Sequence, residues 1–266
     1  MDLKVSDCTD LIFNNLFLTT KRKNNISIFI SGAEQVGTSW SALSIAHALN
    51  LLNKKVLLVD GRGSLSNISS YLCLQNNNHL EDYFNGKKTL NQLIVAYKNK
   101  DFNLLTAISG NKYIAQPPIG RIQLFSQDLN IIAKNYNHTF IDLGTDLLEK
   151  NISLCQIAKN IIILCSDGND GLVKTLDTIK YLNQIGFNDN CKIIINKANS
   201  FEGGYKIYEK LGKAAERNGL KFPDLLGIIR LDTRIRDTIK NKDLLLSRYP
   251  TSEAAQDISE IAKWFV

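Results

Sequence analysis

Two glycines, a threonine and a serine lie in an order that is typical of phosphate-binding loops. A short apolar stretch, residues 26–30, leads into Gly32, and Gly37, Thr38 and Ser39 follow after four further residues. The Walker A pattern, G-x-x-x-x-G-K-[ST] between a strand and a helix, surrounds phosphates with backbone N–H groups and one lysine. Gly32, Gly37 and Ser39 are in register with this pattern, but Thr38 occupies the lysine position. The sequence therefore predicts a nucleotide-binding loop that lacks its usual cation.

Two aspartates that close apolar runs could complete a magnesium site beside this loop. Asp60 ends one run, and Asp142 ends another. The carboxyl ends of parallel strands form the ligand crevice of a doubly wound sheet, so both carboxylates are expected near Ser39. A hydroxyl and carboxylates beside a phosphate cradle are the ligands that Mg²⁺ prefers. We therefore predict Ser39, Asp60 and Asp142 as magnesium ligands if a nucleotide binds, with Asp60 as the candidate catalytic residue; a turn or cap role is the alternative for either aspartate.

Short β-branched runs alternate with longer helical patterns along the chain, and these are the elements that must position the loop. Several runs are apolar throughout, as expected for strands that are covered on both faces. This alternation predicts an α/β fold, a single doubly wound and mostly parallel sheet flanked by helices. The expected strands are 26–30, 56–59, 103–107, 139–143, 161–165, 192–196 and 225–229, and the expected helices are 39–53, 90–97, 122–135, 171–185, 205–218 and 252–265.

Composition favours an ordinary globular protein. The chain has 266 residues, of which 44% are hydrophobic and 22% charged, and this suits one domain with a full-sized core. No run approaches the roughly 20 apolar residues of a membrane span. The five cysteines are scattered without a C-x-x-C pair, which favours buried free thiols in a reducing cytosol. The three histidines are far apart, so no metal site of their own is expected.

The motifs taken together resemble the MinD/ParA family of deviant-Walker ATPases over nearly all of residues 24–266. The strand that ends in Asp142 is similar to Walker B, and Asn196 matches the family asparagine that lies near the adenine. The resemblance implies a SIMIBI-type P-loop NTPase fold for residues 26–266. It also implies that nucleotide would be contacted by Gly32, Gly37, Thr38, Ser39 and Asn196.

Two branches of the family share further features with the chain. The tail from Tyr249 to Ala255 resembles the P-x-S-x-A-A ending of the FlhG branch, and residues 79–86 resemble a segment of the same branch. FlhG-like proteins control the number and placement of flagella. Gly37-Thr38-Ser39 instead resembles the loop of the TadZ/CpaE branch, which marks cell poles for pilus assembly. The sequence leaves both branches open.

Both lysines that act on phosphates in the family are absent. Thr38 occupies the position of the family lysine that contacts the β- and γ-phosphates. Ala33 occupies the position of the signature lysine that reaches across a dimer. A hydrogen bond to a charged group contributes roughly 1.5–3 kcal/mol, so two losses cost roughly 3–6 kcal/mol, or about two to four decades of affinity. Glu34 adds a carboxylate and Gln35 replaces a glycine, while Arg62 is a candidate substitute cation.

These departures predict a MinD/FlhG-like spatial regulator with a degenerate nucleotide site. Such a pseudo-ATPase would position or regulate a flagellar or pilus assembly through protein contacts, with weak binding of ATP and Mg²⁺ and little or no hydrolysis. The alternatives are an active ATP-dependent dimerisation switch with an atypical loop, and a ParA-like DNA partitioning protein. The expected partners are proteins of a polar flagellar or pilus apparatus and a second copy of the chain, but not DNA or a membrane. The expected location is the cytoplasm, at the pole or the membrane periphery.

Two further regions of the chain could contribute binding surfaces. Residues 1–25 form a predicted N-terminal helical arm, in which the apolar stripe of residues 10–18 is expected to pack on the domain edge; a docking arm for a partner or a membrane is the alternative. Late in the chain, aspartates are interleaved with basic residues and cancel much of their field, which favours a solvated face over a DNA site. These basic residues are Arg230, Arg234, Arg236, Lys240, Lys242 and Arg248.

Overall fold

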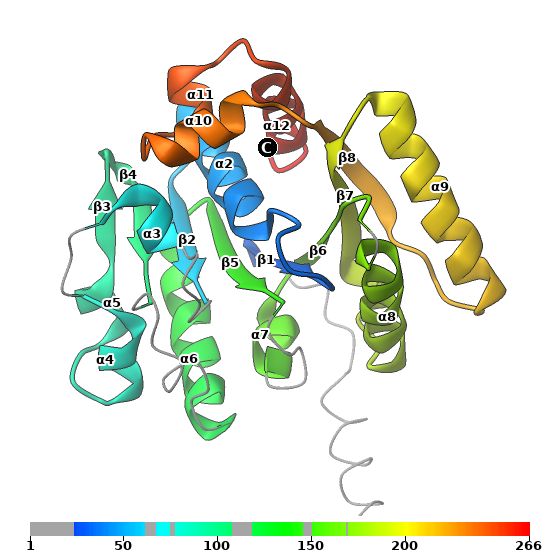
Figure 1. Ribbon diagram of the computed structural model, residues 1–266. Coiled ribbons are helices and arrows are strands. Elements are labelled where there is room, and N and C mark those ends of the chain that lie inside the picture. The colour runs from blue at the N-terminus through cyan, green and yellow to red at the C-terminus, as the bar shows by residue number, and fades with distance from the viewer. Residues whose placement is uncertain (1–23, 62–67, 75–77, 108–118, 146–150, 169) are drawn as a thin grey trace, which may run out of the picture.

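The computed structural model describes residues 24–61, 68–74, 78–107, 119–145, 151–168 and 170–266. Within these ranges the chain forms an eight-stranded sheet in the order β3-β4-β2-β5-β1-β6-β7-β8 (Figure 1). Neighbouring strands are parallel except for β3 and β4. The strands are β1 Ile26–Ser31, β2 Val56–Asp60, β3 Val95–Tyr97, β4 Asn99–Leu105, β5 His138–Gly144, β6 Asn160–Cys165, β7 Cys191–Ala198 and β8 Asp224–Arg230.

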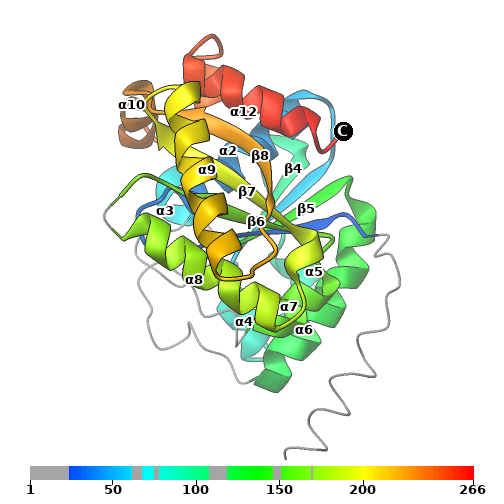
Figure 2. The ribbon, with the colours of Figure 1, turned by 90° about the vertical axis from the view of Figure 1, so that its right-hand side faces the viewer.

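Helices connect the parallel strands and cover both faces of the sheet, as the view from the side shows (Figure 2). The predicted doubly wound α/β class is therefore confirmed. The helices are α2 Thr38–Leu51, α3 Ile68–Leu72, α4 Leu80–Phe84, α5 Leu90–Leu93, α6 Ile119–Ile132, α7 Ile152–Ile157, α8 Gly171–Gln184, α9 Phe201–Arg217, α10 Arg234–Lys240, α11 Leu245–Arg248 and α12 Glu253–Lys263, with short 3-10 turns at Ala133–Asn135 and Asn188–Asn190.

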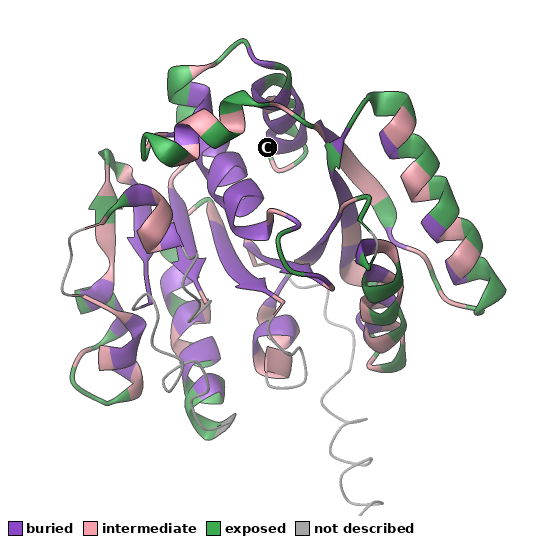
Figure 3. Cartoon of the chain, in the orientation of Figure 1, coloured by how far each residue is buried: buried purple, intermediate pink, exposed green. Residues whose placement is uncertain are grey.

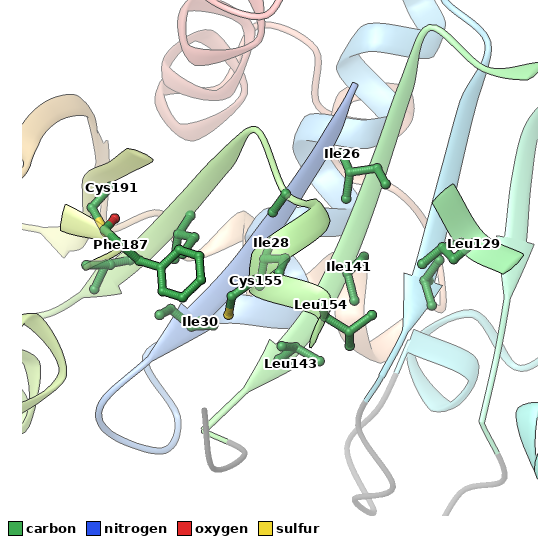
Figure 4. Close-up of a cluster of buried hydrophobic side chains, with 14 of the residues drawn as sticks. Ile26, Ile28, Ile30, Leu129, Ile141, Leu143, Leu154, Cys155, Phe187 and Cys191 are labelled. Atoms are coloured by element: carbon green, nitrogen blue, oxygen red, sulfur yellow. The ribbon is translucent and has the colours of Figure 1, made fainter. Parts of the chain in front are cut away.

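The central strands are apolar on both faces, and they supply two separate hydrophobic cores. Successive strand residues point to opposite faces, so Ile28 and Ile30 lie in one core and Phe29 lies in the other. The first core packs under α4 to α9, and Figure 4 shows part of it around Phe187 and Cys155. The second core packs under α2, α3, α11 and α12. Strands β1, β2, β5 and β6 are buried almost along their whole lengths between these layers (Figure 3).

The helix expected over residues 90–97 is wrong. The structure has a four-residue helix, α5, and then the edge strand β3, which pairs antiparallel with β4. Ile94 is already extended, and Val95 lies opposite Leu104. β-Branched and aromatic side chains fit a pleated surface, and here pairing with a neighbouring strand decided between two readings that the short apolar pattern allowed.

The remaining sequence predictions on the fold have mixed outcomes. Apart from residues 24 and 25, the expected N-terminal arm lies outside the described residues, as does Arg62. Cys155, Cys165 and Cys191 are buried free thiols as predicted, whereas Cys73 is exposed. No helix among the described residues combines the length and the apolarity that a membrane crossing requires.

Candidate functional site

The predicted phosphate loop lies at the centre of the sheet, at the carboxyl end of β1. This strand is flanked by β5 on one side and β6 on the other, and the loop leads directly into α2 (Figure 1). Helix α2 begins at Thr38, after Gly37 in a left-handed conformation, and no side chain caps its first turn. Sequence reasoning therefore placed the strand, loop and helix correctly, and the geometry inside the loop decides what they can do.

Both glycines of the loop are required by packing. A Cβ atom on Gly32 would lie 2.2 Å from the carbonyl oxygen of Lys174 at the start of α8. Gly37 has φ +96°, and a Cβ atom there would lie 2.5 Å from Nδ2 of Asn196. Either contact is shorter than any tolerated for a real side chain, and the positive φ adds strain. The glycine spacing of the motif is thus explained by the fold, whether or not a phosphate binds.

Thr38, which stands at the lysine position, faces the interior of the loop. Its hydroxyl donates a hydrogen bond of 2.9 Å to Oγ of Ser31, and the Ser31 hydroxyl donates one of 3.0 Å to the carbonyl of Ala33. Thr38 is only 3% exposed. A short buried hydroxyl that is used in this way supplies neither charge nor reach toward a bound phosphate. Ser31 was not singled out from the sequence, because a serine at a strand end has no distinctive pattern.

The two strand-end aspartates lie side by side, as predicted. Asp60 and Asp142 are partners in the register of β2 and β5, and both side chains are fully buried. Each carboxylate accepts a backbone hydrogen bond, Asp60 from the N–H of Ile68 at 2.8 Å and Asp142 from the N–H of Gly144 at 3.1 Å. Both aspartates therefore also serve the turn role that was the alternative reading.

Asn196 reaches the loop from the end of β7, with a role in packing that the sequence did not predict. Its Nδ2 donates a hydrogen bond of 2.7 Å to the carbonyl of Val36, and its side chain is buried. The next residue, Lys197, places its ammonium 2.5 Å from the carbonyl oxygen of Gln35. Sequence reasoning missed Lys197. The one available signal was its place directly after the predicted asparagine at a strand end.

Arg230 is held by its own network of contacts at the end of β8. Its guanidinium binds both carboxylate oxygens of Asp257, at 2.9 and 3.1 Å, and lies 2.6 Å from Glu253 on the same helix, α12. The ring of Phe201 stacks over it at 4.4 Å. These contacts tie β8 to α12 and to the start of α9, and they commit the charge of Arg230 to neighbouring carboxylates.

The site combines oxygen-bearing side chains of the kind that Mg²⁺ prefers with neutral side chains at the phosphate positions. Ser39, Asp60 and Asp142 carry the oxygen ligands that Mg²⁺ prefers, and all three are buried at the carboxyl edge of the sheet. Among the described residues, no group of three or more histidines, cysteines, aspartates or glutamates could hold a metal alone. At the phosphate positions Ala33 and Thr38 bring no charge, so the residues present do not fit a triphosphate, and we derive no hydrolysis step from them.

Comparison with known proteins places this geometry in a broader context. No protein-family model matches the chain. The antiactivator FleN of Pseudomonas aeruginosa is 22% identical over 236 residues, which cover 87% of this chain and 82% of the relative. The septum site-determining protein MinD of Pyrococcus horikoshii, solved with Mg-ADP, superposes with a TM-score of 0.73 at 19% identity over 90% of this chain and 94% of that one. A ParA family ATPase of Chlorobium tepidum gives 0.74 at 17% identity over 90% and 99%.

The chain has the fold of the MinD and ParA-family ATPases. The solved structures match the chain in fold, and FleN is a relative that matches it in sequence. A further MinD-type structure, that of Aquifex aeolicus MinD in complex with MinC, superposes with a TM-score of 0.71 at 19% identity over 90% of this chain and 95% of that one. At the two positions where the sequence pattern leads one to expect lysines, the loop of this chain carries Ala33 and Thr38.

Proposed function

We propose that this chain is a MinD/FlhG-like regulator that acts through protein contacts and has lost effective ATP binding. The observation that carries the proposal is the buried Thr38 hydroxyl, which is turned onto Ser31 where a phosphate-binding lysine would stand. Phosphoryl transfer depends almost wholly on positioning and on stabilising charge, so loss of the cation should affect hydrolysis even more than binding.

The loop can keep its shape without a nucleotide, which supports the same proposal. Gly32 and Gly37 are required by contacts with Lys174 and Asn196, and Asn196 bonds the loop carbonyl of Val36. A loop whose shape is held by contacts within the fold can present a fixed surface to partner proteins. Glu34 is exposed on the loop, where its carboxylate would repel phosphates.

The relatives indicate the kind of process in which such a surface would act. FleN is an antiactivator, and one MinD structure contains the partner MinC. We infer that this chain likewise works by binding other proteins, in the control of a flagellar or pilus assembly. A cytoplasmic location, at the pole or at the membrane periphery, and a homodimer belong to the same proposal.

The decisive experiment is isothermal titration of the protein with ATP and with ADP, with and without Mg²⁺. Because both lysines are lost, we expect a Kd for ATP above about 0.1 mM, which is an affinity roughly two or more decades weaker than micromolar binding. Micromolar, Mg²⁺-dependent binding with turnover would overturn the proposal.

The variant Thr38→Lys tests the cause of the weak binding. It should strengthen ATP binding by about 10- to 100-fold, the effect of one charge-assisted contact of roughly 1.5–3 kcal/mol. Thr38→Val is the matched control, because it removes the bond to Ser31 without adding charge and should leave ATP binding as weak as before. Equal binding by both variants would show that the missing lysine is not the reason.

An ATP-dependent dimerisation switch is a second candidate, which the magnesium-type ligands Ser39, Asp60 and Asp142 favour. In that case a partner must supply the missing cation, and ATP should bind tightly only when the partner is present. A DNA partitioning role has less support, because Arg230, Arg234 and Arg248 each form an ion pair with an aspartate.

A further inference from the structure

Two consecutive residues at the end of β7 hold the phosphate loop from one side. Asn196 donates to the carbonyl of Val36 at 2.7 Å, and Lys197 donates to the carbonyl of Gln35 at 2.5 Å. The bonded residues are about 160 positions apart in the chain, with sequence separations of 160 and 162. Two adjacent peptide groups of the loop are therefore fixed by one strand end.

These two bonds determine which way the loop amides face. In a planar trans peptide the C=O and the following N–H point in opposite directions. When β7 binds the carbonyls of Gln35 and Val36, the N–H groups of Val36 and Gly37 must point away from β7. The bonds thus set the orientation of the backbone groups that line a loop of this type, without any contribution from a phosphate.

The contact between the loop and the end of β7 leaves both segments little conformational freedom. Gln35 and Lys197 both adopt φ +59°, a left-handed conformation that is uncommon for residues other than glycine. The Asn196 side chain is oriented by a second bond, from the N–H of Lys197 to its Oδ1 at 2.9 Å. Gly37 leaves no space for a side chain between the loop and Asn196. Strain of this kind persists only where surrounding contacts enforce it.

The Lys197 ammonium has no competing carboxylate within the part of the chain that the structure describes. None of the ion pairs found among those residues includes Lys197. Burial, and then the charge of Arg236, lower the pKa of Lys197 below its ordinary value. The charge of Arg236 thus disfavours the ammonium form of Lys197, whereas the hydrogen bond to the Gln35 carbonyl favours it.

We propose that Lys197 is a positioning residue that latches the phosphate loop in one conformation and makes the loop surface independent of nucleotide. The inference rests on the proposed function, because a latch made by the protein itself matters most where no bound triphosphate orders the loop. It assigns to a lysine outside the loop an ordering role, exerted on loop carbonyls and not on a phosphate.

Hydrogen–deuterium exchange of the nucleotide-free protein tests the latch. In Lys197→Met, the peptides that span Ala33–Ser41 should exchange at least about tenfold faster than in the wild type, while global stability in urea changes little. Lys197→Arg keeps a cationic donor and should restore most of the protection. The matched control is Lys192→Met on the same strand, since Lys192 pairs with Asp224 and does not touch the loop. Unchanged exchange in Lys197→Met would overturn the proposal.

Titration of the same variants with ATP separates this proposal from the function on which it rests. If the wild type binds ATP tightly, the pseudo-ATPase proposal fails, yet faster loop exchange in nucleotide-free Lys197→Met would still support the latch. If Lys197→Met lowers ATP affinity while loop exchange is unchanged, Lys197 is a phosphate ligand and the latch is wrong.

Discussion

At the scale of single residues, the glycines of the loop are required by packing contacts that do not involve a nucleotide. Gly37 has the φ of a left-handed residue, and its missing Cβ leaves room for Asn196. The hydroxyl of Thr38 donates a hydrogen bond to the hydroxyl oxygen of Ser31. The two glycines of the motif thus serve the packing of the fold, whereas Thr38 stands at the position of the lysine that would bind phosphate.

The variant Gly37→Ala should therefore destabilise the fold even without nucleotide. A positive φ for a non-glycine residue costs roughly 1–3 kcal/mol, and the clash with Asn196 adds to it. Urea unfolding measures the loss. Gly120→Ala is the control, because no atom lies within 4 Å of its added Cβ and its helix favours alanine. Equal midpoints for the two variants would contradict the packing explanation.

At the scale of elements, Arg230 joins three segments around the carboxyl end of β8. Its guanidinium is paired with the buried Asp257 on α12 and lies under Phe201 of α9. The side chain of Asp257 is 2% exposed, so its carboxylate depends on this partner. Arg230 thus connects β8 with two helices, whereas the other basic residues of this region, Arg234, Arg236, Lys240, Lys242 and Arg248, are exposed.

Removal of the Arg230 side chain should lower the free energy of unfolding substantially. In Arg230→Ala the carboxylate of Asp257 is left buried without its counter-charge, and breaking such a pair costs roughly 3 kcal/mol or more. Lys192→Ala is the comparison, since its partner Asp224 is 80% exposed and such pairs contribute roughly 0–1 kcal/mol. Thermal and urea unfolding of both variants should separate them clearly. A loss for Arg230→Ala no larger than that for Lys192→Ala would show that Asp257 does not depend on the arginine.

At the scale of the whole molecule, two histidines with lowered pKa values, the buried His47 and the half-buried His138, make stability depend on pH. Burial, and then the charge of Lys98, lower the pKa of His47 from 6.5 to about 4; Asp243 opposes the shift. Burial, then Lys54 and Lys159, lower the pKa of His138 from 6.5 to about 4 as well. The native state therefore holds both imidazoles neutral where the unfolded chain would already be protonated.

We expect the free energy of unfolding to fall as the pH drops from about 6.5 to 4. In this window the unfolded state binds more protons than the native state, so acid favours unfolding, by up to roughly 3 kcal/mol for a fully buried histidine such as His47. In His47→Gln the slope of unfolding free energy against pH should be smaller, even if the variant is less stable overall. A slope equal to that of the wild type would exclude His47 as its source.

The whole molecule should also keep its oligomeric state when ATP is added. A loop without lysines, held by Lys197 and Asn196, gives the nucleotide little with which to change an interface. Sedimentation of the protein with and without ATP and Mg²⁺ should give the same mass, whereas Thr38→Lys should regain some response. A dimer of the wild type that forms only with ATP would favour the switch candidate.

The sequence alone determined the class of fold and the location of the site. Short β-branched runs that are apolar throughout predict buried parallel strands, because strands of this kind are covered on both faces. The loop pattern and the strand-end aspartates then placed Gly37, Ser39, Asp60 and Asp142 at one edge, since parallel strands end together. These inferences needed only local patterns and one general rule of topology.

The tertiary structure alone decided how the residues of the site are used. Whether Thr38 faces outward or toward Ser31, and whether Lys197 touches Gln35, depends on contacts between positions far apart in the chain. The same is true of Val95, which pairs with β4 where the sequence predicted a helix. Such contacts are set by the packing of the whole domain, because burial and strand pairing override the weak preferences of a short segment.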